Sequence, residues 1–246
     1  MFHETIERDN TDVFISWGWM DKSKKIIPAP NILASILVRQ KKYSTNLSNN
    51  LILWIGTEPT TQHLMFLESF PTTTTMIPYL KWQERFLLCL NTNVLSQLIF
   101  RPYPTKKWHH HLNSLNNKLK IDDQNNKENF FERLKNTKVM ISDHIGTSFL
   151  FALALNIPTI LFWEKKTWPL REDAKPYFEL LKTAKIYHET PESAALHLNG
   201  IVNNLDKWWQ NEMVQDTRRK FCKNYILTSD SFINDWVKIL TQLQKN

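Results

Sequence analysis

From residue 51 onward, short apolar runs alternate with stretches whose apolar residues recur at helical spacing. The apolar runs predict buried strands at 51–55, 95–100, 139–142, 159–163 and 185–187. The stretches between them predict helices at 77–90, 146–156, 170–184 and 193–203, and the end of a short helix at 130–134. Strands that alternate with helices in this way indicate an α/β fold, in which a parallel sheet is covered on both faces.

The two ends of the chain carry different patterns. Residues 1–50 contain a proline break at Pro28–Ala29–Pro30 and little periodicity, so we expect an irregular lead-in or interdomain remnant there. Residues 51–204 make up the predicted α/β domain. Residues 205–246 are expected to form a helical extension, whose aromatic side chains fall at apolar helical positions and therefore pack in a core.

Composition places the chain among ordinary globular proteins. No apolar run reaches the ~18–20 residues that a membrane-spanning helix needs. The N-terminus lacks the basic flank and apolar core of a secretory signal, and two cysteines are too few for a disulfide framework. We therefore expect a cytoplasmic protein.

The net charge of +7 would suit a phosphorylated substrate, an anionic membrane surface or nucleic acid. The basic residues occur in short scattered clusters, as they also do on an ordinary solvated surface. We predict no nucleic-acid partner, and we keep peripheral contact with the inner membrane surface as an expectation.

Metal and cofactor chemistry have little support in the sequence. The four glycines lie too far apart for a dinucleotide fingerprint or a phosphate-binding P-loop. The chain also lacks H-E-x-x-H, C-x-x-C and D-x-D motifs. The run His109–His111 does not suit one ion, because consecutive residues of a helix point ~100° apart. We predict no metal and no cofactor.

The most informative stretch is Lys138–Trp163, which reads as strand, tight turn, helix and strand. The first strand runs directly into Ser142, Asp143 and His144, Gly146 permits a sharp turn, and Thr147 or Ser148 can cap the helix. A helix N-terminus at the carboxyl edge of a parallel sheet is a common location for anions and other ligands. Local turn geometry alone also favours Asp, Gly and Thr here, so a purely structural turn remains the alternative.

Two further segments end at the same predicted edge. Arg101 follows a buried strand and is fixed by prolines, so its guanidinium can bind phosphate through two hydrogen bonds, or form a structural salt bridge. In the segment Trp163–Arg171, Lys165, Lys166 and Arg171 can close over a phosphate while Trp168 stacks on a base or sugar. The alternative is an exposed basic loop with Trp168 packed inward.

Several motifs together resemble a known family. They are F-I-S-W-G-W at 14–19, R-P-Y-P at 101–104, S-D-H-x-G-T at 142–147, N-I-P-T-I-L-F-W at 156–163, P-Y-F at 176–178 and W-W at 208–209. In these motifs the chain resembles a family of transferases encoded with bacterial surface-polysaccharide genes. That family is similar to the GT-B glycosyltransferases and, more distantly, to the CDP-glycerol glycerophosphotransferases.

The resemblance implies a GT-B architecture, in which two Rossmann-like domains face a cleft and the C-terminal domain binds a nucleotide-activated donor. This chain resembles the C-terminal half, so a separate N-terminal domain or chain is an expected partner. The final helices of GT-B proteins cross back to pack on the N-terminal domain, which gives the C-terminal extension an expected destination.

The resemblance also implies roles for the candidate residues in transferring a nucleotide-activated sugar or polyol phosphate. Donor and phosphate binding falls to Arg101, Gly146, Thr147, Ser148, Lys166, Trp168 and Arg171. Asp143 and His144 are the catalytic candidates, which orient the donor or transfer a proton. Phe151 and Tyr103 stand where relatives often carry Glu and His. These departures favour the alternative, a non-catalytic module that binds a nucleotide or a partner chain.

Overall fold

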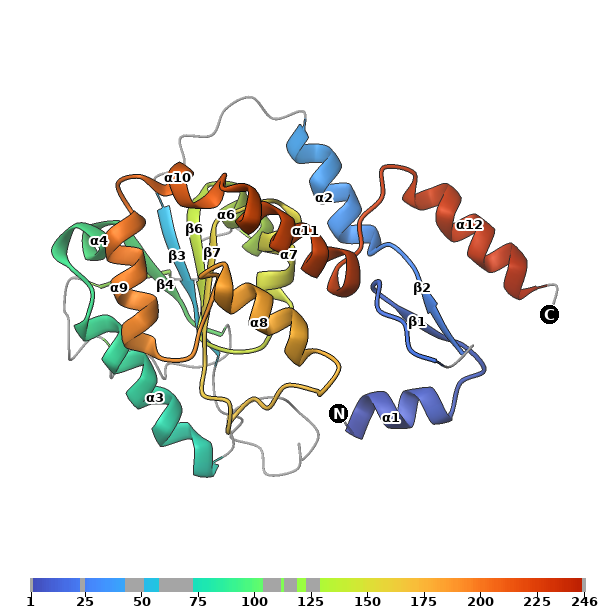
Figure 1. The fold of residues 1–246 in the computed structure, drawn as a ribbon, viewed down its shortest axis with the longest axis horizontal. Coiled ribbons are helices and arrows are strands. Elements are labelled where there is room, and N and C mark those ends of the chain that lie inside the picture. The colour runs from blue at the N-terminus through green and yellow to red at the C-terminus, as the bar shows by residue number, and fades with distance from the viewer. Residues whose placement is uncertain are drawn as a thin grey trace.

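The computed structural model describes residues 2–22, 25–42, 51–57, 73–103, 112, 119–122 and 129–244 (Figure 1). The strands are β1 (Phe14–Ser16), β2 (Ile26–Pro28), β3 (Leu51–Ile55), β4 (Leu98–Arg101), β5 (Lys120–Ile121), β6 (Thr137–Ser142), β7 (Thr159–Phe162) and β8 (Tyr187–His188). The first helices are α1 (Phe2–Asp9), α2 (Ile32–Lys42), α3 (Thr73–Leu88), α4 (Thr92–Gln97), α6 (Phe130–Lys135) and α7 (Ser148–Ala154). The later ones are α8 (Lys175–Thr183), α9 (Pro191–Ile201), α10 (Leu205–Trp209), α11 (Glu212–Tyr225) and α12 (Phe232–Leu243).

Strands β3 to β8 form one six-stranded sheet in the order β5-β4-β3-β6-β7-β8, and every pair is parallel. Counted from β3, this is the 3-2-1-4-5-6 order of the Rossmann fold. The α/β, Rossmann-like fold predicted from the sequence is therefore confirmed, as is a helical C-terminal extension with a break between α11 and α12.

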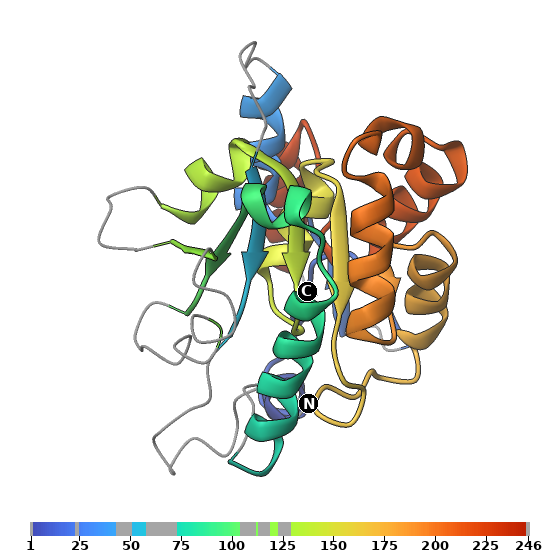
Figure 2. The ribbon, with the colours of Figure 1, turned by 90° about the vertical axis from the view of Figure 1, so that its left-hand side faces the viewer.

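Alternate residues of each central strand enter two different cores. On one face, Leu53, Met140 and Leu161 pack with α2, α7, α8 and α11. On the other face, Ile52, Val139 and Ile160 pack with α3, α4 and α9. Figure 1 shows the two groups of helices on opposite sides of the strands, and Figure 2 views the sheet from the side of α3 and α9.

Some predicted bounds are corrected. The strand predicted at 95–100 is partly a helix. Asn91 caps α4 by accepting a hydrogen bond from the Val94 N–H, and β4 begins only at Leu98. The helix predicted from residue 170 begins at Lys175, where Pro176 suits the first turn. It ends in a left-handed residue, Lys185 at φ 57°, so the strand predicted at 185–187 starts two residues later.

The N-terminal segment, expected to be irregular, contains two helices and a parallel strand pair within its described part. The backbone ladder of β1 and β2 is extended by hydrogen bonds from Phe14 N–H to the Lys25 carbonyl and from Ala29 N–H to the Ser16 carbonyl. The proline break separates β2 from α2, which Asn31 caps through the Ala34 N–H. Strands of three residues carry too few positions for a readable alternation.

The last part of the chain returns to this N-terminal segment. Helices α10 and α11 pack on the sheet, and Trp209 and Phe221 belong to its core. The chain then passes along β1 and α2: Leu227 N–H donates to the Trp17 carbonyl, Asn31 N–H donates to the Leu227 carbonyl, and the Trp236 indole donates to the Pro30 carbonyl. We call the described part of residues 2–42 together with α12 the terminal unit, and residues 51–225 the sheet domain (Figure 1).

A tight contact at Gly18 fixes the joint between these regions. Gly18 has φ 131°, and a Cβ at this position would lie 2.2 Å from the Lys223 carbonyl oxygen, so only glycine fits there.

Among the described helices, none combines the length and apolar character required to cross a bilayer.

Candidate functional site

The carboxyl ends of β3 and β6 define the switch point of the sheet. The chain leaves β3 toward β4 on one side, and it returns to place β6 on the other side. Ile55 lies in register with Arg101 and with Ser142, so the segments after β3, β4 and β6 emerge at one level. In open parallel sheets this crevice is where ligands bind.

Asp143, the first residue after β6, is buried with an exposed fraction of 1%. Its Oδ2 accepts hydrogen bonds from Trp54 Nε1 at 2.9 Å and Gln83 Nε2 at 2.7 Å. Its Oδ1 lies 2.9 Å from Tyr79 Oη and 3.0 Å from His144 Nδ1. A carboxylate offers about four acceptor positions, and these four donors fill them. Asp143 therefore orients its neighbours rather than contacting a ligand.

The contact with Asp143 decides which nitrogen of His144 carries the proton. Because a carboxylate only accepts, the neutral ring is protonated at Nδ1, and Nε2 is left with a free lone pair. The His144 side chain remains 11% exposed. A Cβ at Gly146 would lie 2.9 Å from this Nε2, so glycine lets the backbone pass close to the ring. The pair can therefore present a base at the switch point.

The loop after β7 supplies a wall to this pair. Trp168 is 4% exposed and meets Tyr79 edge-on at a ring separation of 5.4 Å, with the His144 ring 6.3 Å away. Trp168 therefore packs inward, which was the alternative to stacking on a ligand, and its indole supports the Tyr79 and His144 rings. Lys166 lies exposed on the same loop, and Lys165 forms an ion pair with Glu189.

Arg171 and Arg101 both lie at this edge of the sheet, and both already pair with carboxylates. Arg171 contacts Asp173 through Nε and Nη2 at 2.9 and 2.7 Å, and it lies over the Trp19 ring of the terminal unit at 5.2 Å. Arg101 Nη1 contacts Asp122 Oδ2 at 2.6 Å. Asp122 is buried and also accepts from Arg133, so one carboxylate contacts two guanidinium groups.

The first turn of α7 carries the remaining candidates. Thr147 is exposed at the N-cap, and its side chain makes no capping hydrogen bond. Ser148 Oγ is buried and has no hydrogen-bond partner among the described residues. The side-chain cap expected from the sequence is therefore absent, and Thr147 is accessible beside Gly146 and His144.

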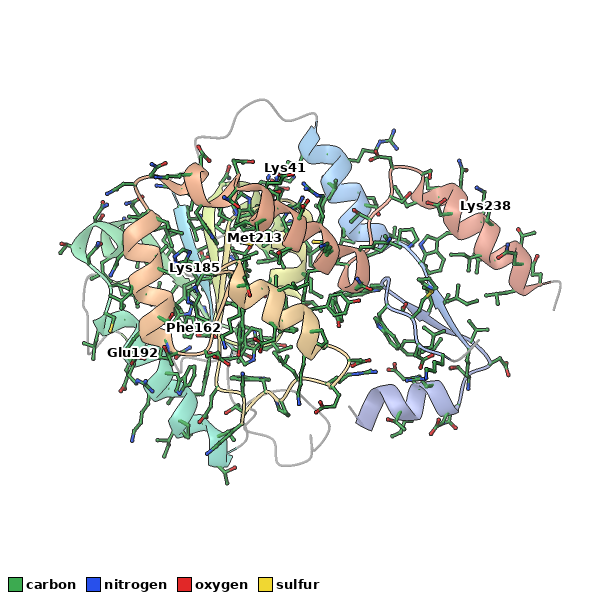
Figure 3. The ribbon with its side chains drawn as sticks, in the orientation of Figure 1. Lys41, Phe162, Lys185, Glu192, Met213 and Lys238 are labelled. Carbon is green, nitrogen blue, oxygen red and sulfur yellow. The ribbon has the colours of Figure 1, made fainter. Side chains whose placement is uncertain are left out.

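Two cavities lie on the β8 side of the sheet. One of about 340 Å³ borders the loop after β7, with Lys165, Glu172, Phe178 and Tyr187 in its wall. A larger one of about 1360 Å³ runs between α8 and α9 at the outer edge of β8, past Lys185, Glu192 and Met213 (Figure 3). Within the described part of the chain, no three His, Cys, Asp or Glu side chains cluster as metal ligands would.

Sequence reasoning missed the residues that hold Asp143. Trp54 stands in an otherwise aliphatic strand, and Tyr79 and Gln83 share one helical face at i, i+4 spacing. A tryptophan among Leu and Ile, and a polar pair on a buried face, were the available signals. The run His109–His111 lies outside the described residues.

Comparison with known proteins gives three results. No curated protein sequence matches the chain. The wall teichoic acid polymerase TagF is similar in structure at 15% identity and a TM-score of 0.46, over 100% of this chain and 61% of that one. WaaG, a glycosyltransferase involved in lipopolysaccharide biosynthesis, is similar at 8% identity and a TM-score of 0.41, over 83% of this chain and 55% of that one. The chain thus spans less than two thirds of either protein.

The third result is a family match. The sequence model of the LIC12162 family transferase matches residues 1–240. The match includes the terminal unit, the switch-point pair Asp143–His144 and the loop after β7. It confirms the transferase family expected from the sequence motifs. Because it extends over nearly the whole chain, this protein belongs to the LIC12162 family of transferases.

Proposed function

We propose that the chain binds a nucleotide-activated donor and transfers its sugar or polyol phosphate in the biosynthesis of bacterial cell-surface carbohydrate. The observation that carries this proposal is the Asp143–His144 pair at the switch point of a Rossmann-order sheet. In this pair a buried carboxylate holds an imidazole with Nε2 directed away from it. A base at a ligand crevice is what the activation of an acceptor hydroxyl requires.

The proposed reaction assigns each group a step. His144 Nε2 takes the proton of the acceptor hydroxyl as its oxygen bonds to the transferred group. The bond between that group and the nucleotide phosphate breaks, and the phosphate leaves with the electron pair. Asp143 stabilises the imidazolium that forms.

The positive groups at the edge would stabilise the leaving phosphate. Arg101 and Arg133 bring two guanidinium groups to this edge, where both contact the Asp122 carboxylate. Lys166 lies exposed on the loop after β7, Thr147 and Ser148 open α7, and Arg171 lies beside the terminal unit. Electrostatic stabilisation of this kind is commonly the largest contribution to such transfers.

The first experiment separates binding from turnover. Isothermal titration against CDP-, UDP- and GDP-linked donors identifies the nucleotide, and His144→Gln is then compared with the wild type. We expect donor affinity to stay within about twofold and turnover to fall at least a hundredfold, because one general base contributes ~10²–10⁴-fold. Lys207→Ala, an exposed change on α10, is the control. Equal turnover in His144→Gln would contradict the assignment.

A second α/β domain, in the same protein or in another chain, is the proposed partner. The terminal unit supports this, because α12 exposes Ile233, Val237 and Leu240 along one stripe at 50–60%. We expect Val237→Glu to weaken co-purification with a co-expressed partner domain. Leu196→Glu, an equally exposed apolar position on α9, is the matched control, and equal loss in both would contradict the proposal.

The same proposal places the protein on the cytoplasmic side of the inner membrane, where nucleotide-activated donors are made. The net charge of +7 favours peripheral contact with anionic lipid. A flotation assay with anionic and neutral vesicles tests this, and equal binding to both would contradict it.

A non-catalytic nucleotide- or partner-binding module is the second candidate. The observation in its favour is that the guanidinium groups of Arg101 and Arg171 already pair with Asp122 and Asp173. This candidate predicts donor binding with no turnover, even when the partner domain is present. The titration and turnover measurements above distinguish it from the transferase.

A further inference from the structure

The hydroxyl group of Tyr79 lies within hydrogen-bond distance of two donors and two acceptors, but it has one proton to donate. This side chain of α3 is 2% exposed. Its Oη accepts from Thr57 N–H at 2.9 Å and from Gln83 Nε2 at 2.7 Å, which uses both lone pairs. The single hydroxyl proton can then go to Asp143 Oδ1 at 2.9 Å or to the Thr57 carbonyl at 3.2 Å. The charged and nearer acceptor is Asp143, and hydrogen bonds to ionised acceptors are the stronger ones.

The oxygen that receives this proton is the one that holds His144. Oδ1 of Asp143 lies 2.9 Å from Tyr79 Oη and 3.0 Å from His144 Nδ1, whereas Trp54 and Gln83 occupy Oδ2. Two donors on one oxygen compete for the same negative charge. The more strongly Tyr79 donates, the weaker is the pull of the carboxylate on the imidazole proton.

The Tyr79 ring is itself held from two sides. Trp168 packs edge-on against it from the loop after β7, and Gln83 lies one helical turn away on α3. Asp143 is the ionised group that contacts the imidazole directly, and Trp168, the contact from the β7 loop, is uncharged. The hydroxyl therefore approaches Oδ1 from one fixed direction.

We propose that Tyr79 is a positioning residue, whose hydroxyl fixes Oδ1 of Asp143 and limits the charge that this oxygen offers to His144. By this division the imidazole keeps its proton at Nδ1, directed at the carboxylate, and the lone pair of Nε2 points away from it. The proposal rests on the proposed role of His144 and adds the group that adjusts it.

A purely structural role for Tyr79 makes a different prediction. If the hydroxyl only fastens α3 to the ends of β3 and β6, its removal lowers stability and leaves the imidazole unchanged. The resonance of the His144 Nδ1 proton separates the two roles, because it moves downfield when the bond to the carboxylate strengthens.

The experiment compares three proteins by NMR with labelled histidine, each first shown to be folded by circular dichroism. In Tyr79→Phe we expect the His144 Nδ1 proton to shift downfield, because Oδ1 has lost its competing donor. Tyr187→Phe is the matched control, because it removes the hydroxyl of another buried tyrosine, one without a hydrogen-bond partner among the described residues. We expect no shift there.

A second substitution keeps the test valid if Tyr79→Phe fails to fold. Replacing Tyr79 by 3-fluorotyrosine retains the ring and hydroxyl but makes the hydroxyl a stronger donor, so the same proton should move upfield. An unchanged resonance in the folded variants would overturn the proposal. These readouts need no donor or acceptor, so an absence of transferase activity would refute the proposed function and leave this test standing.

Discussion

The sheet domain buries most of its apolar side chains, whereas the terminal unit leaves many of its own exposed. In the sheet domain, the central strands β6 and β7 are buried almost throughout, and helices cover both of their faces. In the terminal unit, the strands have three residues each and are mostly half-buried. Eight of the fourteen exposed large hydrophobic side chains in the described residues belong to this unit: Ile6, Trp17, Met20, Ile32, Leu33, Ile233, Val237 and Leu240.

This contrast indicates that the terminal unit depends on contacts outside itself. A parallel pair of strands is normally part of a larger sheet that is covered on both faces, and two strands alone are marginally stable. The stability of the sheet domain therefore follows from its internal packing. The stability of the terminal unit depends more on the surfaces that it contacts.

The largest expected effect lies inside the sheet domain. Asp143→Ala leaves four buried hydrogen-bond donors without an acceptor, and each unsatisfied donor costs about 1–3 kcal/mol. We expect a loss of about 4 kcal/mol in the free energy of unfolding, measured by urea denaturation. Asp21→Asn, which removes a part-exposed ion pair with Arg8 in the terminal unit, should cost less than about 1 kcal/mol. Equal losses would erase the contrast between the two regions.

A matched pair of apolar truncations sharpens the comparison. Leu161 lies on β7, the strand between β6 and β8, and its side chain is fully buried. Leu161→Ala should therefore cost about 3 kcal/mol. Val237→Ala removes a side chain that is 56% exposed and should cost less than about 0.5 kcal/mol in the isolated chain. Thermal and urea unfolding measure both. A large loss in Val237→Ala alone would show that the stripe on α12 is already covered, by self-association for example.

Acid should weaken the sheet domain through two histidines. Burial lowers the pKa of His188 to about 4, and burial with the neighbouring His188 lowers the pKa of His197 to about 3. Both folded-state pKa values lie below the unfolded value of about 6.5, so the unfolded chain binds protons first as the pH falls. The stabilisation is present above about pH 6.5 and is lost between about pH 6.5 and 3.

We expect several kcal/mol of the free energy of unfolding to disappear over that interval from these two groups. Urea denaturation at several pH values measures the slope, and His188→Gln should flatten it. An unchanged slope in that variant would assign the acid sensitivity to other groups.

The smallest expected effect lies at the contact between the two regions. Arg171 lies over the Trp19 ring at 5.2 Å, and a cation–π contact of this kind contributes about 0.5–1 kcal/mol. A double-mutant cycle with Arg171→Ala and Trp19→Leu should give a coupling energy of that size. A coupling near zero would mean that this contact adds nothing to the packing of α2 and to the backbone contacts around Gly18 and Leu227, which also join the two regions.

The two regions also differ in how far the sequence predicted them. In the sheet domain, the run 139–142 and the helix that begins at Ser148 were readable, because long apolar stretches and a Gly-Thr-Ser turn mark them. Three-residue strands such as β1 and β2 were not, because they span too few alternations. The late start of β4 has another cause, because the short helix α4, capped by Asn91, occupies residues 92–97.

The site was predicted where chemistry follows a strand directly, as at Asp143 and His144. Its supports come from distant parts of the chain, since Tyr79 and Asp143 are 64 positions apart. Likewise, the pairing of Arg101 with Asp122 requires that β4 and β5 be neighbours, which no local pattern reveals. Local sequence thus indicates what stands at the edge of the sheet, and tertiary structure decides what each group does there.

The return of the chain to its own beginning has a consequence for biosynthesis. Residues 14–35 leave the ribosome about 200 residues before their partners Leu227, Ser229 and Trp236. The strands of the six-stranded sheet have all been made once residue 188 has emerged, so they can pair with one another before α11 and α12 are available. Closing a loop of about 200 residues is slow compared with local pairing. During synthesis, β1 and β2 therefore stay exposed to chaperones until α12 and the segment before it have been made.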